Sequence, residues 1–320
     1  MEHSLTMFND VLFHYIFGSN EGIDCLKSLI NAVLQDSGHQ PVDSLTIRNP
    51  FNYAAFVEGK QSIIDVRAKA GDGRFVNVEV QLSQQGSFTS RVLYYWSRTY
   101  GDQLSESQKW SNLNPTVSIS FTNFSQFPEE FGIHVTGEIR ADKNPDYLIT
   151  DQLQLHFLNF SRLPIKPDHT ILNNMIGSVM YYMVHNQDTE NPLIPSIRKK
   201  YAEVETMEQR YQSAMSDEQI RIAAEIRDKA QRDYLGHMDF ARESGIKEGI
   251  KEGIKEGEVL GRIVKAQHQL GQLLNKKFGI TDEERNIIAS CTNEQLLDDA
   301  ILLVMDAQSK EQVLEELSIK

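Results

Sequence analysis

The chain has 320 residues and a net charge of −13, with 40% hydrophobic and 24% charged residues. This composition is typical of a globular protein and does not favour a disordered chain, and the length suits two or three structural units. No run approaches the roughly 18 consecutive apolar residues that a membrane helix needs. The first residues, MEHSLTMFND, lack the basic start and apolar run of a secretion signal. With only Cys25 and Cys291, which have no metal-ligand spacing, we expect a cytoplasmic protein.

The excess of acidic residues argues against a protein that coats DNA non-specifically, because phosphate contacts need Lys and Arg. Residues 1–120 hold 9 Lys and Arg against 12 Asp and Glu, so most of the acidity falls in the rest of the chain. A cleft with local basic residues in the first part is therefore compatible with DNA binding.

The spacing of apolar residues predicts an α/β region followed by a helical one. Before residue 166 it predicts helices over 8–17, 22–35 and 88–104, and strands over 42–48, 62–70, 74–82, 115–121, 131–140 and 151–160. After it, the spacing predicts helices over 170–186 and 196–244 and three short amphipathic helices within 258–318.

The segment 63–81, IIDVRAKAGDGRFVNVEVQ, carries the candidate chemistry. Two strand-like runs flank Gly71-Asp72-Gly73, which is typical of a tight hairpin whose glycine takes a positive φ. Because side chains alternate along a strand, each strand is apolar on one face and polar on the other. The polar face carries Asp65, Arg67 and Lys69 on the first strand and Asn77, Glu79 and Gln81 on the second.

The length of the turn sets an expected register for this hairpin. If Ala70 faces Arg74, Asp65 lies directly opposite Glu79. Two opposed carboxylates repel each other, and a divalent metal ion such as Mg²⁺ would neutralise them and could activate water for attack on a phosphate. The alternative is an ordinary hairpin with a solvated polar face, in which Arg67 neutralises one acid. A register slip of one residue would also separate the two acids.

Asp65, the hairpin and Glu79-Val80-Gln81 resemble the core of the PD-(D/E)XK nucleases, in which an Asp ends one strand and an acid-x-Lys lies on the next. More specifically, the chain is similar to the family of recombination-promoting nucleases and related transposases. The resemblance rests on several motifs in order, among them NDVLFHYIFG, LINAVL, GKQSIIDVRAKAGDGRFVNVEVQ and FTSRVLYYWSRTYGDQL, and on the Gly-x-Lys-Glu repeat.

The resemblance implies a catalytic centre made of Asp65, Glu79 and Gln81. Asp65 and Glu79 would bind Mg²⁺ or Mn²⁺, helped by the backbone carbonyl of Val80, and Asp10 on the first helix would be a supplementary acid. Gln81 departs from the lysine of the superfamily, although related nucleases also have glutamine there. Glutamine cannot act as a general base or carry a positive charge, so water activation would rest on the metal or on the substrate phosphate.

Arg91, Tyr95 and Arg98 lie at i, i+4 and i+7 of the predicted helix 88–104 and share one face. We interpret Arg91 and Tyr95 as contacts to DNA phosphates beside the metal. The alternative is that Tyr95 packs and the arginines are solvated. Rather than stacking on bases, the aromatic side chains of this helix are expected to lie in the core: Tyr94, Tyr95, Trp96 and Tyr100.

The run GIKEGIKEGIKEG, residues 245–257, repeats every four residues, so its glycines and its isoleucines each form a stripe around a helix. Each glycine costs about 1 kcal/mol relative to alanine, so such a helix needs a partner packed on the stripe. We predict that residues 241–263 form a helix that self-associates. A flexible linker and packing within the chain are the alternatives.

Together these features predict an α/β protein with a PD-(D/E)XK restriction-endonuclease-like core, a mixed sheet flanked by helices, followed by a mostly helical region. The expected division is a nuclease domain (1–165), a helical region (166–244), the repeat (245–261) and a small helical domain (262–320). The predicted function is metal-dependent DNA cleavage in recombination or in mobile elements, by a homo-oligomer without a membrane segment. The alternatives are a catalytically degenerate DNA-binding or interaction module and a phage-defence or toxin nuclease.

Overall fold

A computed structural model describes residues 5–317, except 51–65, 85 and 106. The chain divides into two compact units, Met1–Leu235 and Gly236–Lys320. The first unit joins the predicted nuclease and helical regions, because helices after residue 165 pack on the same core as the sheet. The finer division of the chain stays a prediction.

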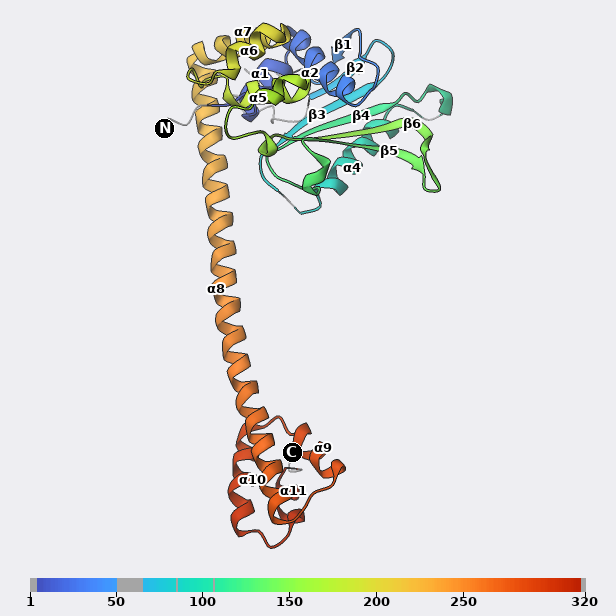
Figure 1. The fold of residues 1–320 in the computed structure, drawn as a ribbon. Coiled ribbons are helices and arrows are strands. Elements are labelled where there is room, and N and C mark those ends of the chain that lie inside the picture. Colours follow the sequence, from blue (N-terminus) through green and yellow to red (C-terminus); the bar gives the residue numbers. More distant parts are fainter. Residues whose placement is uncertain (1–4, 51–65, 85, 106, 318–320) are drawn as a thin grey trace. The chain divides into compact units, whose positions relative to one another are not determined.

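The first unit is built on a six-stranded mixed sheet in the order β1-β2-β3-β4-β6-β5 (Figure 1). Strands β3, β4 and β6 are parallel to one another, and the other neighbours are antiparallel. The bounds are β1 Leu45–Ile47, β2 Val66–Ala70, β3 Phe75–Gln81, β4 Thr116–Thr122, β5 His134–Ala141 and β6 Asn144–Asn159. Strand β6 is longer than predicted because its first residues form a hairpin with β5.

The hairpin of β2 and β3 has the predicted register. Val66 lies opposite Val78 and Arg67 opposite Asn77. The turn closes through a hydrogen bond from the amide of Ala70 to the carbonyl of Arg74 (2.8 Å), and Gly73 has a φ of 99°, which favours glycine. The loop length therefore fixes which residues of the two strands face each other.

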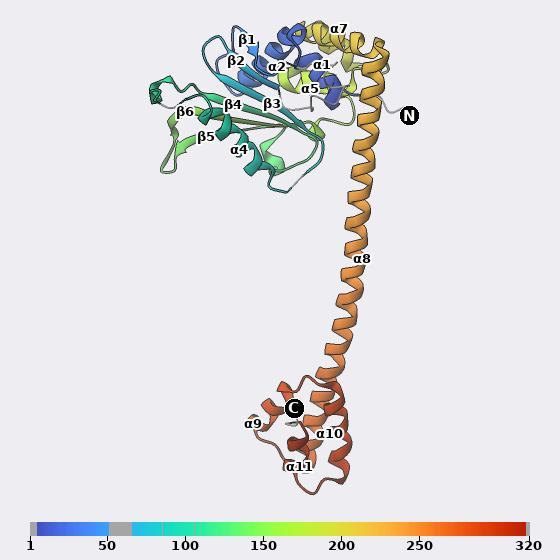
Figure 2. The ribbon, with the colours of Figure 1, turned by 180° about the vertical axis from the view of Figure 1, so that it is seen from behind.

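Helices cover both faces of the sheet. Figures 1 and 2 show α4 (Phe88–Gly101) on one face and α1 (Asp10–Phe17), α2 (Ile23–Asp36) and α5 (Met175–His185) on the other. Two further helices, α6 (Leu193–Lys200) and α7 (Glu203–Ser216), join the larger core on the second face. The short 3-10 helices are Asn20–Gly22, Trp110–Asn112, Glu129–Phe131, Phe160–Arg162 and His169–Asn173.

The apolar faces of the strands explain this arrangement. Strand β4 is buried along its whole length, as its run of small and apolar residues predicts. Val66 and Val78 face the larger core with the helices α1 and α2. Phe88 and Val92 of α4 pack with Phe157 of β6 in a smaller core on the other face. The polar face of the β2–β3 hairpin is therefore on the side of α4.

The second unit is helical. It contains the later part of α8 (Glu218–Lys277), then α9 (Asp282–Ser290), α10 (Glu294–Asp306) and α11 (Lys310–Glu316). Leu270 and Leu274 pack with Leu297 and Val313 in a core of its own. The 245–257 repeat lies inside α8, so the repeat is helical and is not a flexible linker.

The mixed sheet flanked by helices, with a mostly helical C-terminal region, confirms the predicted fold class. In the part of the chain that the structure describes, every helix is too short or too polar to cross a lipid bilayer.

Candidate functional site

The candidate site lies along the polar face of β3, beneath α4. Asn77 is buried there, and its Nδ2 donates a hydrogen bond to Oγ1 of Thr99 on α4 (2.8 Å). Glu79 and Gln81 follow on the same face of β3 and are partly buried. Strand β3 thus presents an amide, a carboxylate and a second amide toward the helix in that order.

Glu79 is held by the neighbouring strand. The parallel register of β3 and β4 places Ser120 beside Glu79. Ser120 is buried, and its Oγ donates a hydrogen bond to Oε1 of Glu79 (2.8 Å). Hydrogen bonds to a carboxylate are stronger than those between neutral groups, so this contact orients the side chain of Glu79.

Gln81 lies between its own turn and α4. Its Nε2 donates to the carbonyl of Ser83 (3.0 Å), and its Oε1 accepts a hydrogen bond from Nη2 of Arg91 (2.5 Å). The guanidinium of Arg91 also lies 5.3 Å from the ring centre of Phe88, within the range of a cation–π contact. The structure therefore brings together two residues that the sequence had singled out separately.

The other residues of this helix face divide between solvent and core. Tyr95 is 38% and Tyr94 57% exposed, so the prediction that their rings lie in the core is wrong for both. Trp96 packs against the smaller core, stacks on Tyr100 and donates from Nε1 to the carbonyl of Thr116. The face of α4 that packs on the sheet consists of Phe88, Val92 and Trp96. Tyr94 and Tyr95 lie on other faces of the helix and are therefore exposed to solvent.

Asp10 lies in the first turn of α1, after the N-cap Asn9. Its Oδ2 is 2.7 Å from Nε of Arg227 on α8, and Nδ2 of Asn9 donates to the carbonyl of Ala224 (3.0 Å). The predicted supplementary acid is thus paired with the helix that leads out of the first unit.

The remaining predicted metal ligands are placed only in part. Asp65 lies outside the described residues. Val80 lies on β3 between Glu79 and Gln81, with its side chain against the larger core. Among the described residues, no group of three or more His, Cys, Asp or Glu side chains could hold a metal ion.

Comparison with protein families matches residues 7–241 to the PD-(D/E)XK nuclease family transposases. The chain belongs to this family. Comparisons with curated proteins and with solved structures gave no match. The matched segment covers the whole sheet, the polar face of β3 and the α8 residues that pair with α1.

Membership of the PD-(D/E)XK nuclease family transposases supports a function related to nucleases and transposases, with DNA as the substrate. Nucleases of this superfamily generally use divalent metal ions. The matched range contains both Glu79 and Gln81 of β3.

Ser120, which donates to Glu79, is not among the residues that the sequence predicts for the candidate site. The strand 115–121 reads PTVSISF, and its serines interrupt an otherwise apolar run at alternate positions. A polar side chain that recurs with a period of two in a buried strand needs a partner. This signal identifies Ser120 as a residue with a polar partner, but the sequence does not say which one.

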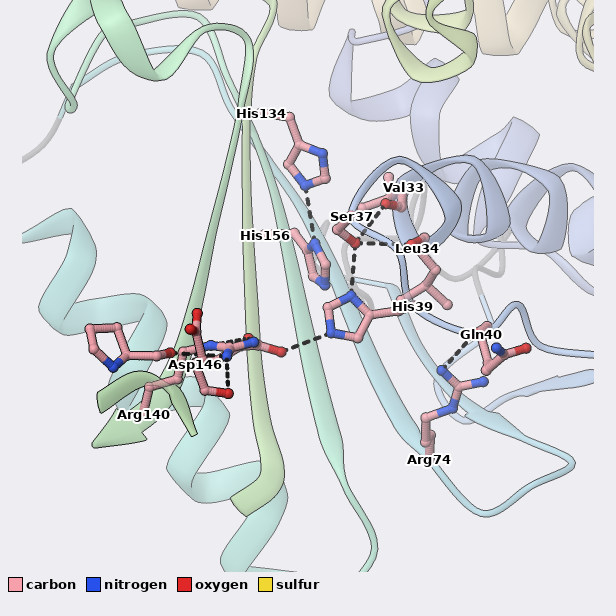
Figure 3. Close-up of polar contacts among 12 residues, drawn as sticks. Val33, Leu34, Ser37, His39, Gln40, Arg74, His134, Arg140, Asp146 and His156 are labelled. Atoms are coloured by element: carbon pink, nitrogen blue, oxygen red, sulfur yellow. Dashed lines mark hydrogen bonds and ion pairs between the residues drawn. The ribbon is translucent and has the colours of Figure 1, made fainter. Parts of the chain in front are cut away.

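A second polar cluster lies on the opposite face of the sheet, where β5 and β6 meet the end of α2 (Figure 3). His134 donates from Nδ1 to Asp36 (2.6 Å), and a hydrogen bond joins its Nε2 to Nδ1 of His156 (3.1 Å). His39 bonds to Glu138 (2.9 Å). Burial, with the adjacent His134 and His39, lowers the pKa of His156 to about 3. The hydrogen bonds of Asp36 and His39 to β5 hold the end of α2 against the edge of the sheet.

Proposed function

We propose that this chain is a DNA endonuclease that hydrolyses phosphodiester bonds with Mg²⁺ or Mn²⁺, in recombination or in the movement of mobile elements. The observation that carries the proposal is the polar face of β3 in a member of the PD-(D/E)XK nuclease family transposases. There the carboxylate of Glu79 and the pair of Gln81 and Arg91 follow each other along one strand end.

In this proposal the carboxylates of Asp65 and Glu79 and the backbone carbonyl of Val80 bind the metal ion, and Asp10 supplements them. These are oxygen ligands, which Mg²⁺ and Mn²⁺ prefer, so the residue types fit the ion. When bound, the ion would lower the pKa of a water molecule and stabilise charge on the attacked phosphate.

The other side chains of the site have their own tasks. Ser120 keeps the carboxylate of Glu79 oriented through its hydrogen bond. Arg91 and Tyr95, which share one face of α4, contact the phosphates of the DNA next to the bond that is cut. Such contacts fix the position of the duplex without reading its sequence.

The proposal also includes self-association of two copies of the chain through α8. Ile246, Ile250 and Ile254 of α8 are each more than half exposed. A Cβ added at Gly249 or Gly253 would meet no atom within 4 Å outside the helix's own backbone, among the residues that the structure describes. Two copies packed on these stripes would bury the isoleucines and offset the cost of the glycines. Two joined nuclease units could cut both strands of one duplex.

A plasmid cleavage assay with Mg²⁺ tests the proposed activity. We expect cleavage by the wild-type chain, its loss in excess chelator, and a fall to background for Asp65→Ala and Glu79→Ala. Asp72→Asn is the matched control, since it removes an acidic charge from the turn of the same hairpin, where Asp72 pairs with Arg74. Full activity of both alanine variants would exclude the proposed site.

One observation favours a second candidate, a DNA-binding module that has lost catalysis. Gln81 is neutral and cannot take over the charge of the superfamily's lysine. A wild-type chain of this kind would bind duplex DNA, would not cut it, and would show no Mg²⁺ affinity that depends on Glu79. Titration calorimetry with Mg²⁺ on the wild type and on Glu79→Ala separates the two functions.

A further inference from the structure

The contact between Gln81 and Arg91 joins the end of β3 to the first turn of α4. Nη2 of Arg91 donates to Oε1 of Gln81 over 2.5 Å. The amide group cannot turn freely, because its Nε2 donates to the carbonyl of Ser83. Gln81 thus presents its oxygen, the only acceptor of its side chain, to the guanidinium.

The backbone of α4 fixes the other side of this contact. The amide of Arg91 donates to the carbonyl of Ser87 (3.0 Å), so Arg91 belongs to the first hydrogen-bonded turn of the helix. Phe88, on the preceding turn, is buried and lies under the guanidinium. A buried ring below and an amide oxygen beside it restrict the guanidinium to one region.

The contact brings the positive charge of Arg91 next to residue 81 of β3. Residue 81 follows Glu79 on the same face of β3, where the superfamily has lysine. In this chain the residue is neutral, yet Arg91 brings a positive charge to within hydrogen-bond distance of it. A guanidinium carries five N–H donors in a planar fork, so a bond to Gln81 is compatible with bonds to phosphate oxygens.

We propose that Gln81 and Arg91 together replace the missing lysine: Arg91 is the catalytic residue that stabilises the charge developing on the attacked phosphate, and Gln81 positions its guanidinium. This inference rests on the proposed nuclease function and assigns Arg91 a more specific task than positioning the duplex. Arginine keeps its proton throughout, so the pair supplies electrostatic stabilisation and no general base.

The test is a rescue experiment that compares Arg91→Ala, Gln81→Lys, Gln81→Leu and the double variant Gln81→Lys/Arg91→Ala. Cleavage of a short duplex with Mg²⁺ gives kcat and KM, and binding of a fluorescent duplex in Ca²⁺ gives an affinity without turnover. We expect Arg91→Ala to lower kcat by about 100-fold or more, the usual effect of losing one preorganised donor. Gln81→Leu should lower kcat by about 10-fold, since it removes the positioning contact and leaves the charge.

The double variant decides the question. In the Arg91→Ala background, Gln81→Lys should restore kcat to within about 10-fold of wild type and should restore duplex affinity as well. Arg98→Ala is the matched control, because Arg98 lies on the same helix face, is largely exposed and pairs with Asp102. We expect this control to keep the wild-type kcat. Thermal melts establish that each variant is folded.

The outcomes separate this inference from the function on which it rests. If the wild type cleaves and Arg91→Ala has the same kcat and affinity, the inference alone is wrong. Failure of Gln81→Lys to restore a folded Arg91→Ala chain in both assays also overturns it. If the wild type does not cleave but binds duplex, the endonuclease function and the catalytic task of Arg91 both fail. A chain that neither cleaves nor binds removes DNA as its target as well.

Discussion

Oδ2 of Asp10 lies 2.7 Å from Nε of Arg227, so an ion pair joins the first turn of α1 to α8 across 217 positions of sequence. Both side chains keep some exposure to solvent, and exposed pairs of this kind contribute about 0–1 kcal/mol to stability. This ion pair bears on the proposed metal site, because Arg227 offsets the charge of Asp10, the proposed supplementary acid.

We predict that Arg227→Ala binds Mg²⁺ or Mn²⁺ about two- to fivefold more tightly than wild type, because the variant lacks the guanidinium that competes with the metal ion for Asp10. The ion pair contributes less than about 1 kcal/mol, which sets the size of the expected gain in affinity. Titration calorimetry on the two chains measures the affinity. Arg221→Ala is the control, since Arg221 pairs with Glu225 on the same helix. Weaker metal binding by Arg227→Ala would show instead that Arg227 holds Asp10 in place as a ligand.

Ser120→Ala removes the hydrogen bond to Glu79 and leaves the fold of β4 intact. We predict about 10- to 100-fold weaker metal binding, the usual effect of losing a residue that orients a ligand. Calorimetry with Mn²⁺ gives the affinity, and a urea melt gives the stability. Ser118→Ala, two positions earlier in the same buried strand, should keep the wild-type affinity. Equal affinities for both variants would show that Ser120 does not support the site.

Acid should destabilise the first unit through His156. Its pKa is lowered to about 3 by burial and by His134 and His39, while Asp36 acts in the opposite sense. Below a pH of about 6.5 the unfolded chain therefore takes up a proton that the folded chain refuses, so stability falls as the pH falls toward 3. The loss should reach roughly 2 kcal/mol at pH 5.

Urea melts at pH 7, 6 and 5 test this prediction, with His156→Gln as the variant. The substitution should flatten the dependence on pH, whereas the exposed His169→Gln should leave it unchanged. The carboxylates of the cluster, Asp36 and Glu138, add little to this dependence between pH 7 and 5. Hydrogen bonding from His134 lowers the pKa of Asp36, and hydrogen bonds from His39 and Arg140 outweigh burial and lower the pKa of Glu138. Their contributions to stability are lost only at lower pH.

The glycines of the α8 repeat distinguish self-association from a solvated helix. Gly249→Ala and Gly253→Ala each add a Cβ that favours an isolated helix by about 1 kcal/mol. If two copies approach closely at the glycine stripe, the same Cβ atoms keep them apart. We predict that the double variant lowers the molar mass of the full chain in light scattering at micromolar concentration. Lys251→Gln is the control, and a monomeric wild type would contradict the prediction.

The sequence predicts those features of the candidate site that depend on residues close together in the chain. The three-residue turn fixed the facing of Arg67 and Asn77, and the alternation of side chains placed Glu79 and Gln81 on one face. The aromatic residues of α4 were predicted less well. Their spacing shows which of them share a face, but it does not show how much of that face the sheet covers.

By itself, the sequence determined the helices α1, α2 and α4, the described strands and the register of the β2–β3 hairpin, because each depends on neighbours within a few residues. It did not determine the length of α8, which runs from Glu218 to Lys277 through the predicted boundaries at 244 and 261. Only the tertiary structure decided that Ser120 bonds to Glu79, that Arg91 bonds to Gln81 and that Asp10 pairs with Arg227. No short turn connects these partners, so their contacts depend on how strands and helices pack. Packing is a property of the whole core, in which many apolar side chains must fit at once, and a local pattern does not encode it.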